Sequence, residues 1–148
     1  MIGYPDAAAL ESFARRMAPL VRAGDVISLS GELGAGKTTF ARGLLRGLGL
    51  ASEAPSPTFT LVQTYDPPAV WLPVWHVDLY RLSGPEEART LALDEADDAL
   101  LLIEWPERLG GMFSGHALQL RLDFASSGGR GLTAAVPPGW EGRWPPPQ

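Results

Sequence analysis

Residues 31–38 read Gly31-Glu32-Leu33-Gly34-Ala35-Gly36-Lys37-Thr38, and this stretch decides the fold of the chain. It fits the phosphate-binding loop pattern G-x-x-x-x-G-K-[ST] at every fixed position. Residues 25–30 before it have the pattern of a short buried strand, and residues 39–46 after it have that of a helix. A strand before the loop and a helix after it are the setting in which this motif binds phosphate. The sequence therefore predicts a protein that binds a nucleoside triphosphate.

The chemistry of phosphate binding explains the spacing of the loop. Its glycines allow positive φ values and a close approach of the backbone, so that successive N–H groups can point at phosphate oxygens. The helix that follows adds the partial positive charge of its N-terminus. We expect Lys37 to reach the β and γ phosphates and the Thr38 hydroxyl to coordinate Mg²⁺. Lys37 is also the only lysine among twelve basic residues, which is typical of a position that needs a compact ammonium group.

Length, composition and charge limit the possible functions. A chain of 148 residues, with 45% hydrophobic and 20% charged residues, is typical of one soluble globular domain. No apolar run approaches the roughly 20 residues of a membrane span, and the N-terminus has no secretion-signal pattern, so we expect a cytoplasmic protein without a membrane partner. The absence of cysteine excludes a disulfide framework and a thiolate metal site. The net charge of −5 argues against broad, unaided binding of nucleic acid.

The rest of the chain alternates between helical and extended patterns. Asp6 has the position of an N-cap for a helix over 7–21. The continuous apolar run at 99–103 is typical of a central strand that is covered on both faces. A capping-box spacing at 83–86 predicts a helix that runs toward residue 93. The remaining predicted strands are 59–65, 70–80, 118–124 and 131–136.

These elements predict an α/β fold like that of phosphate-loop nucleoside triphosphatases (P-loop NTPases), with three layers, a mixed and mainly parallel sheet, and an antiparallel hairpin. Pro73 predicts that the strand over 70–80 lies partly at a sheet edge or carries a bulge. Residues 1–136 are expected to form a single domain. Residues 137–148 contain five prolines in twelve positions, which predicts a poorly ordered tail.

Glu104 is the first of two carboxylates that could complete a site beside the loop. It directly follows the apolar strand 99–103, where a phosphate-loop fold places an acidic residue near Mg²⁺ or its water shell. The alternative is a solvated glutamate at an abrupt strand exit, because Trp105 and Pro106 come next.

Asp78 is the second carboxylate, in the segment His76-Val77-Asp78-Leu79-Tyr80-Arg81. Alternation along a strand puts His76, Asp78 and Tyr80 on one face, which suggests a site that faces a ligand. The alternative is an ordinary polar outer face. His76 taken alone is interpreted as a structural histidine.

With these residues in place, the chain resembles the TsaE family of small bacterial ATPases, formerly called the YjeE family. The resemblance covers about residues 6 to 108. It depends on four blocks, which follow the family's order along the chain: Gly31-Glu32-Leu33-Gly34-Ala35-Gly36-Lys37-Thr38-Thr39-Phe40, Ser56-Pro57-Thr58-Phe59-Thr60-Leu61-Val62, His76-Val77-Asp78-Leu79-Tyr80-Arg81-Leu82 and Leu102-Ile103-Glu104-Trp105-Pro106-Glu107. After Arg108 the match weakens, and a nucleotide contact from Arg130 is only a hypothesis.

The resemblance implies a role in installing threonylcarbamoyladenosine beside the anticodon of tRNA. It implies that the protein binds and hydrolyses ATP, with Mg²⁺ and with ADP as the product, while docked on a TsaB–TsaD pair, through which it meets tRNA. It also implies slow hydrolysis by the chain alone. The implied nucleotide-binding residues are Gly34, Ala35, Gly36, Lys37, Thr38, Thr39, Ser56 and Thr58, the last two in a mobile, switch-like loop. The implied metal residues are Thr38 and Glu104, and the implied catalytic residues are Asp78 and Glu104.

Three other functions are compatible with a phosphate-binding loop and need separate consideration. A GTPase needs an N-K-x-D motif, which is impossible because the only lysine belongs to the loop. A small-molecule kinase with the same loop would need an acceptor pocket and a mobile lid that carries arginine, and the segment 81–89 could mimic such a lid. A module that senses ATP without meaningful hydrolysis is the third possibility.

Overall fold

The computed structural model describes residues 2–4, 6–32, 34–51, 62–82, 84–113, 115–124 and 129–146. In this part of the chain one sheet of seven strands has the order β1-β7-β6-β2-β5-β4-β3. The strands are β1 (Ile2–Tyr4), β2 (Val26–Ser30), β3 (Val62–Tyr65), β4 (Val74–Asp78), β5 (Leu100–Glu104), β6 (Leu118–Phe124) and β7 (Arg130–Ala135). The α-helices are α1 (Ala7–Met17), α2 (Lys37–Gly47) and α3 (Pro85–Arg89). Four short 3₁₀ helices are η1 (Ala18–Leu20), η2 (Leu93–Glu95), η3 (Pro106–Leu109) and η4 (Pro138–Trp140).

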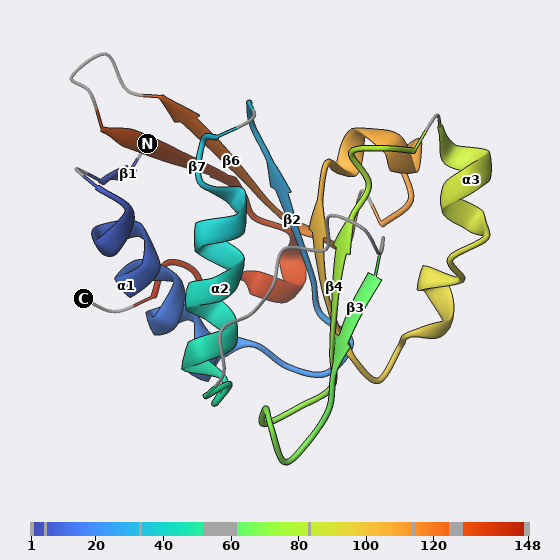
Figure 1. Ribbon diagram of the computed structural model, residues 1–148, viewed down its shortest axis with the longest axis horizontal. Coiled ribbons are helices and arrows are strands. Elements are labelled where there is room, and N and C mark those ends of the chain that lie inside the picture. The colour runs from blue at the N-terminus through green and yellow to red at the C-terminus, as the bar shows by residue number, and fades with distance from the viewer. Residues whose placement is uncertain are drawn as a thin grey trace.

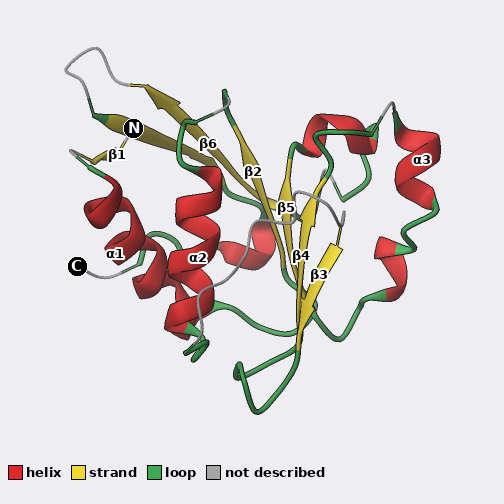
Figure 2. Ribbon diagram, viewed as in Figure 1, coloured by secondary structure: helices red, strands yellow, loops and turns green. Residues whose placement is uncertain are grey.

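The centre of the sheet is parallel and its borders are antiparallel. β2 pairs in parallel with β5 and β6, and β5 pairs in parallel with β4. β3 is antiparallel to β4 at one border, and β7 is antiparallel to both β6 and β1 at the other. The predicted mixed sheet with a parallel core and an antiparallel hairpin is therefore confirmed (Figure 2).

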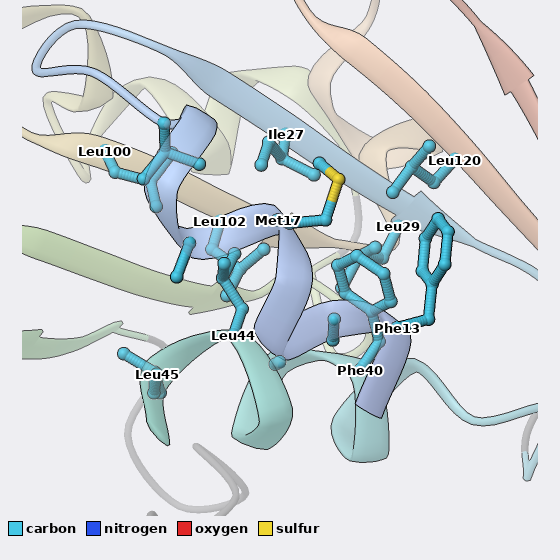
Figure 3. Packing of buried hydrophobic residues seen from close by; sticks show 14 of the residues in the cluster. Phe13, Met17, Ile27, Leu29, Phe40, Leu44, Leu45, Leu100, Leu102 and Leu120 are labelled. Carbon is cyan, nitrogen blue, oxygen red and sulfur yellow. The ribbon is translucent and has the colours of Figure 1, made fainter. Parts of the chain in front are cut away.

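The sheet separates two hydrophobic clusters, which gives three layers. One cluster joins α1 and α2 to one face of the sheet, and Figure 3 shows Phe13 and Met17 of α1 beside Phe40 of α2 and Ile27 and Leu29 of β2. The other cluster joins the opposite face to α3, η2 and η3, which Figure 1 shows on the far side of the sheet from α1 and α2. The central strand β5 contributes to both faces, since all five of its residues are buried.

α1 begins as predicted and ends early. The Asp6 carboxylate caps it by accepting the Ala9 N–H at 2.8 Å. The predicted helix over 7–21 stops at Met17, and residues 18–20 form η1. Pro19 explains the difference, because a proline has no N–H with which to continue the α-helical hydrogen bonds.

The position of β4 contradicts the prediction made from Pro73. β4 lies inside the sheet between β3 and β5, and its strand begins one residue after the proline. Pro73 needs no bulge there, because it contributes its carbonyl, which accepts the Leu100 N–H at 2.8 Å. A proline placed just before a strand removes no hydrogen bond from the ladder.

The helix predicted from residue 83 toward residue 93 is shorter than expected. α3 ends at Arg89, and Ala92 adopts a left-handed conformation with φ of 53° before η2 begins. Gly84 is the N-cap, and Ser83, on which the capping-box prediction rests, lies outside the described residues.

The proline-rich tail packs on the domain, so the prediction that it is poorly ordered is wrong for residues 137–146. Trp140 in η4 is 1% exposed and belongs to the core cluster of α1 and α2. The Trp144 ring meets the Phe13 ring edge-on at a centroid distance of 5.7 Å. A buried indole, Trp140, and a partly buried one, Trp144, therefore anchor this segment, because aromatic side chains bury a large apolar surface.

No helix in the described part of the chain is long and apolar enough to cross a bilayer.

Candidate functional site

The candidate site lies at the carboxyl ends of three neighbouring parallel strands. The glycine-rich loop, residues 31–38, follows β2. Glu104 ends β5 and Asp78 ends β4, and the strand register pairs Glu104 with both Leu29 and Asp78. Parallel strands that end at the same level bring their last side chains and following loops together. The structure thus joins three of the four sequence blocks that carry the resemblance.

Glycine is required at two described positions of the loop. Gly31 has a φ of 134°, and a Cβ added there would collide with the carbonyl oxygen of Leu122. Gly36 has a φ of 115°, and its Cβ would lie 2.6 Å from Leu10 Cδ2 on α1. Because an L side chain is strained at these φ angles, both positions favour glycine, and at Gly31 a backbone atom also blocks a side chain.

α2 directs its N-terminus into this loop. Gly36 is the N-cap, and the Phe40 N–H donates to the Gly36 carbonyl at 2.9 Å as the first helical hydrogen bond. The N–H groups of the first helical turn, including those of Lys37, Thr38 and Thr39, have no partner within the helix. Together with the positive end of the helix dipole they form a place that can hold an anion. The predicted binding residues Gly34, Ala35, Gly36, Lys37, Thr38 and Thr39 all lie here.

The Lys37 side chain is buried inside the loop. It is 5% exposed, and its Nζ donates to the carbonyls of Gly31 at 2.5 Å and Glu32 at 3.0 Å. The same Nζ lies 4.2 Å from the centre of the Trp105 ring. Burial lowers the pKa of Lys37 from its ordinary value, an effect that nearby carboxylates, Glu104 first, oppose. Both of these hydrogen bonds of the buried ammonium go to neutral carbonyls, so it would gain from an anionic oxygen.

Glu104 is buried and has a partner for each carboxylate oxygen. It is 2% exposed, so the alternative of a solvated strand-end glutamate is wrong. Its Oε1 lies 3.4 Å from the Thr38 hydroxyl, and its Oε2 lies 2.7 Å from His76 Nε2. The carboxylate therefore connects the start of α2 to β4.

Asp78 lies beside this pair and is half-buried. Its Oδ1 accepts the Tyr80 N–H at 3.0 Å. Burial raises the pKa of the Asp78 carboxyl, and the Glu104 carboxylate adds to this, while the Tyr80 N–H, His76 and Lys37 lower it. His76, on the same strand face, is 1% exposed, so this face is not the polar outer face that was the alternative.

The donor set fits a cation that arrives with a phosphate. In the described ranges no three His, Cys, Asp or Glu side chains gather to hold a metal ion by themselves. Thr38 and Glu104 offer a hydroxyl and a carboxylate 3.4 Å apart. Mg²⁺ is commonly bound through one or two such protein oxygens and completed by phosphate oxygens and water. The positions predicted for the metal are therefore chemically suitable.

Sequence reasoning missed two contacts of this site. The His76 ring binds Glu104, and the Trp105 ring covers Lys37. The sequence carries a sign of the Trp105 contact, since this aromatic residue directly follows Glu104, whereas the His76 contact depends on which strands are neighbours. Arg130, hypothesised to contact the nucleotide, lies beside the loop, with Nη2 3.5 Å from the Gly34 carbonyl. Ser56 and Thr58, predicted to contact the nucleotide, lie outside the described residues.

Comparison with known proteins agrees with this geometry. The family model described as "Threonylcarbamoyl adenosine biosynthesis protein TsaE" matches residues 4–131. The chain is 43% identical over 118 residues to the tRNA threonylcarbamoyladenosine biosynthesis protein TsaE of Streptomyces coelicolor, covering 78% of this chain and 80% of the relative. The protein of the same name from Bacillus subtilis is 35% identical over 125 residues, or 83% of this chain and 77% of the relative.

A solved structure has the same fold. The crystal structure of YdiB from Bacillus subtilis superposes with a TM-score of 0.74 at 29% sequence identity. The match covers 95% of this chain and 87% of YdiB, so it includes the sheet and both layers that cover it.

Proposed function

This chain belongs to the TsaE family, and we propose that it supports the biosynthesis of threonylcarbamoyladenosine in tRNA by binding and hydrolysing ATP. The role in this modification follows from the name of the matching family and of the curated relatives. The single observation that best supports ATP chemistry is the arrangement at one sheet edge. There the N-terminus of α2, the buried Lys37 ammonium and two carboxylates converge on the same small space.

Each residue of the site has a role in this proposal. The N–H groups of residues 34–39 bind the phosphate oxygens, and Lys37 exchanges the carbonyls of Gly31 and Glu32 for the β and γ phosphates. Thr38 and Glu104 hold Mg²⁺, which when bound neutralises charge on the β and γ phosphates. Asp78 orients the attacking water through its carboxylate and accepts its proton.

The raised pKa of the Asp78 carboxyl suits this last role. A general base works best when its pKa lies closer to the operating pH than that of an ordinary aspartate. Burial and the Glu104 carboxylate supply the shift.

We further propose that hydrolysis is slow in the isolated chain and is stimulated by a TsaB–TsaD pair. Ser56 and Thr58, which the resemblance assigns to the nucleotide and which lie outside the described residues, are the residues through which we propose that such a partner acts. The net charge of −5 favours contact with tRNA through that complex rather than by direct tight binding.

The small-molecule kinase alternative receives less support from the structure. Its lid would be the segment 81–89, but Ala88 in α3 is fully buried and belongs to the second core cluster. Pro85 also packs so closely on Gly110 that a Cβ there would lie 2.5 Å from Pro85 Cγ. A segment docked in this way does not resemble an open, mobile lid.

The test is the steady-state ATPase rate of the chain alone, with the TsaB–TsaD pair, and with small hydroxyl compounds as acceptors. We expect the pair to raise the rate at least several-fold and the acceptors to leave it unchanged. Lys37→Ala with the pair is the background control. An ATPase rate that is unchanged by the TsaB–TsaD pair but rises when a hydroxyl acceptor is added would support the small-molecule kinase alternative. ATP binding with no hydrolysis in the presence of the pair would support an ATP-sensing module.

A further inference from the structure

The Glu104 carboxylate is held from two sides. His76 Nε2 lies 2.7 Å from Oε2, and the side chains of the two residues are 1% and 3% exposed. Oε1 is the other oxygen and lies 3.4 Å from the Thr38 hydroxyl. The shorter, buried contact of Glu104 is thus made by Oε2 with His76, and the longer contact is made by the other oxygen, Oε1, with Thr38.

The protonation of the His76 ring follows from its surroundings. Nδ1 is buried and has no hydrogen-bond partner in the part of the chain that the structure describes. An ionised carboxylate only accepts hydrogen bonds, so Nε2 must carry the proton that it donates to Glu104. A neutral ring then has its bare lone pair on Nδ1, which avoids a buried N–H without an acceptor.

His76 reaches Glu104 because of the strand register. β4 and β5 are parallel, and the register pairs His76 with Leu102 and Asp78 with Glu104, so the four side chains share one face of the sheet. The Leu102 side chain beside His76 is fully buried in the core of α1 and α2. The imidazole therefore lies beside an apolar core, and among the described residues its ring nitrogens have one hydrogen-bond partner, Oε2 of Glu104.

We propose that His76 is a positioning residue, whose Nε2–H holds Oε2 of Glu104 so that Oε1 stays turned toward Thr38. This inference rests on the proposed function and deepens it, since Thr38 and Glu104 are the two residues proposed to hold Mg²⁺. A glutamate side chain has three rotatable bonds, and the strand fixes only its backbone. Partners that orient a metal-binding carboxylate typically change metal affinity or activity by about 10- to 100-fold when they are removed.

The first experiment measures nucleotide binding at varied Mg²⁺ with a fluorescent ADP analogue. In His76→Phe, which keeps a flat ring but has no donor, we expect the half-saturating Mg²⁺ concentration to rise at least about 10-fold. Affinity for the metal-free nucleotide should change less than about 3-fold, because the loop and α2 are untouched. His76→Gln can place an amide N–H near the position of Nε2 and should restore most of the Mg²⁺ response.

Val77→Ala is the matched control. Val77 is fully buried in the same strand but packs in the opposite cluster. It should lower the melting temperature and leave the Mg²⁺ dependence as in the parent. A parental Mg²⁺ dependence in His76→Phe, or an equal change in Val77→Ala, would overturn the inference and reduce His76 to a packing residue.

Glu104→Gln separates failure of this inference from failure of the proposed function. If Glu104→Gln weakens the Mg²⁺ response and His76→Phe does not, only the positioning role is wrong. If neither variant changes the response, Glu104 does not serve the metal, and both statements are overturned. If His76 acts through Glu104, His76→Phe should add little to the change already made by Glu104→Gln.

The nucleotide-free, metal-free protein gives an independent readout. The chain has two histidines, so ring ¹⁵N signals are easily assigned, with the exposed His116 as reference. We expect the His76 ring to be protonated at Nε2 and its signal to shift in Glu104→Gln, while His116 stays unchanged. Protonation at Nδ1 alone would contradict the proposed hydrogen bond.

Discussion

Arg143 forms a bidentate ion pair with Asp25, and the two N–O distances are 2.7 and 3.1 Å. Asp25 lies 118 residues earlier in the chain. The two side chains are only 11% and 10% exposed. The guanidinium also donates to the Leu20 carbonyl at 2.8 Å and lies over the Trp140 ring. The carboxyl-terminal segment is thereby tied to the residues that lead into β2, the strand that carries the glycine-rich loop.

This pair predicts that Arg143→Ala destabilises the protein strongly. Removing one partner leaves a buried charge without compensation, which typically lowers the free energy of unfolding by about 3–5 kcal/mol. Arg121→Ala is the control, because its ion pair with Asp123 is largely exposed and should contribute less than about 1 kcal/mol. Urea denaturation of both variants measures the difference. Similar losses in the two variants would show that the tail is not anchored by this contact.

A second prediction concerns Gly36, the N-cap of α2. Gly36→Ala should lower both the melting temperature and nucleotide affinity, because φ is 115° and the new Cβ would lie 2.6 Å from Leu10 Cδ2. Gly139→Ala is the matched control, since no atom lies within 4 Å of its Cβ position. Calorimetric titration and thermal melting report the two effects. Parental nucleotide affinity in Gly36→Ala would mean that the loop binds no phosphate at this point.

Lys37 carries the third prediction. Lys37→Ala should abolish ATP binding or weaken it severely, because it removes the cation proposed to bind the β and γ phosphates. Arg46→Ala makes the same change of charge at the other end of α2, where Arg46 pairs with Glu11, and should bind ATP as the parent does. Isothermal titration of both variants with ATP and Mg²⁺ is the measurement. Unchanged affinity in Lys37→Ala would contradict the assignment of the loop.

Local signals in the sequence predicted the local structure well. The alternation of residues 118–124 predicts β6 with its actual bounds, and Asp6 caps α1 as its position before an apolar periodicity indicates. These features depend on a few neighbouring residues only. The glycine-rich motif is also a local feature of this kind, which is why the sequence predicts the loop and the start of α2.

Contacts between distant segments were not predictable in this way. His76 and Glu104 are 28 residues apart, and they meet only because β4 and β5 are neighbours in a specific register. From the sequence pattern alone, His76 is therefore interpreted as a structural histidine, and the pattern does not decide whether Glu104 is buried or exposed to solvent. The tail was misjudged for the same reason, because its prolines are visible in the sequence and the pocket that receives Trp140 is not.

The last prediction concerns the effect of the Asp78 carboxyl on the stability of the folded protein. Burial raises the pKa of its carboxyl in the folded protein, with the Glu104 carboxylate as a further cause. Such a group stabilises the fold fully below the pKa of the unfolded chain, which is about 4. This stabilisation is lost as the pH rises through the folded-state pKa. At neutral pH the ionised carboxylate therefore lowers the free energy of unfolding.

We expect Asp78→Asn to melt at a higher temperature than the parent at pH 7, because the amide is uncharged and its oxygen can still accept the Tyr80 N–H. This difference in melting temperature should shrink as the pH falls toward about 4, where the parent carboxyl is protonated as well.

In the same variant, ATP hydrolysis with the partner pair should fall by a large factor while nucleotide affinity is mostly retained. Asp66→Asn, in the exposed turn between β3 and β4, should change none of these. Calorimetric melting from pH 4 to 7.5 and ATPase assays test both parts. A variant that is less stable than the parent at pH 7 and hydrolyses ATP at the parental rate would leave Asp78 with only a structural role at the end of β4.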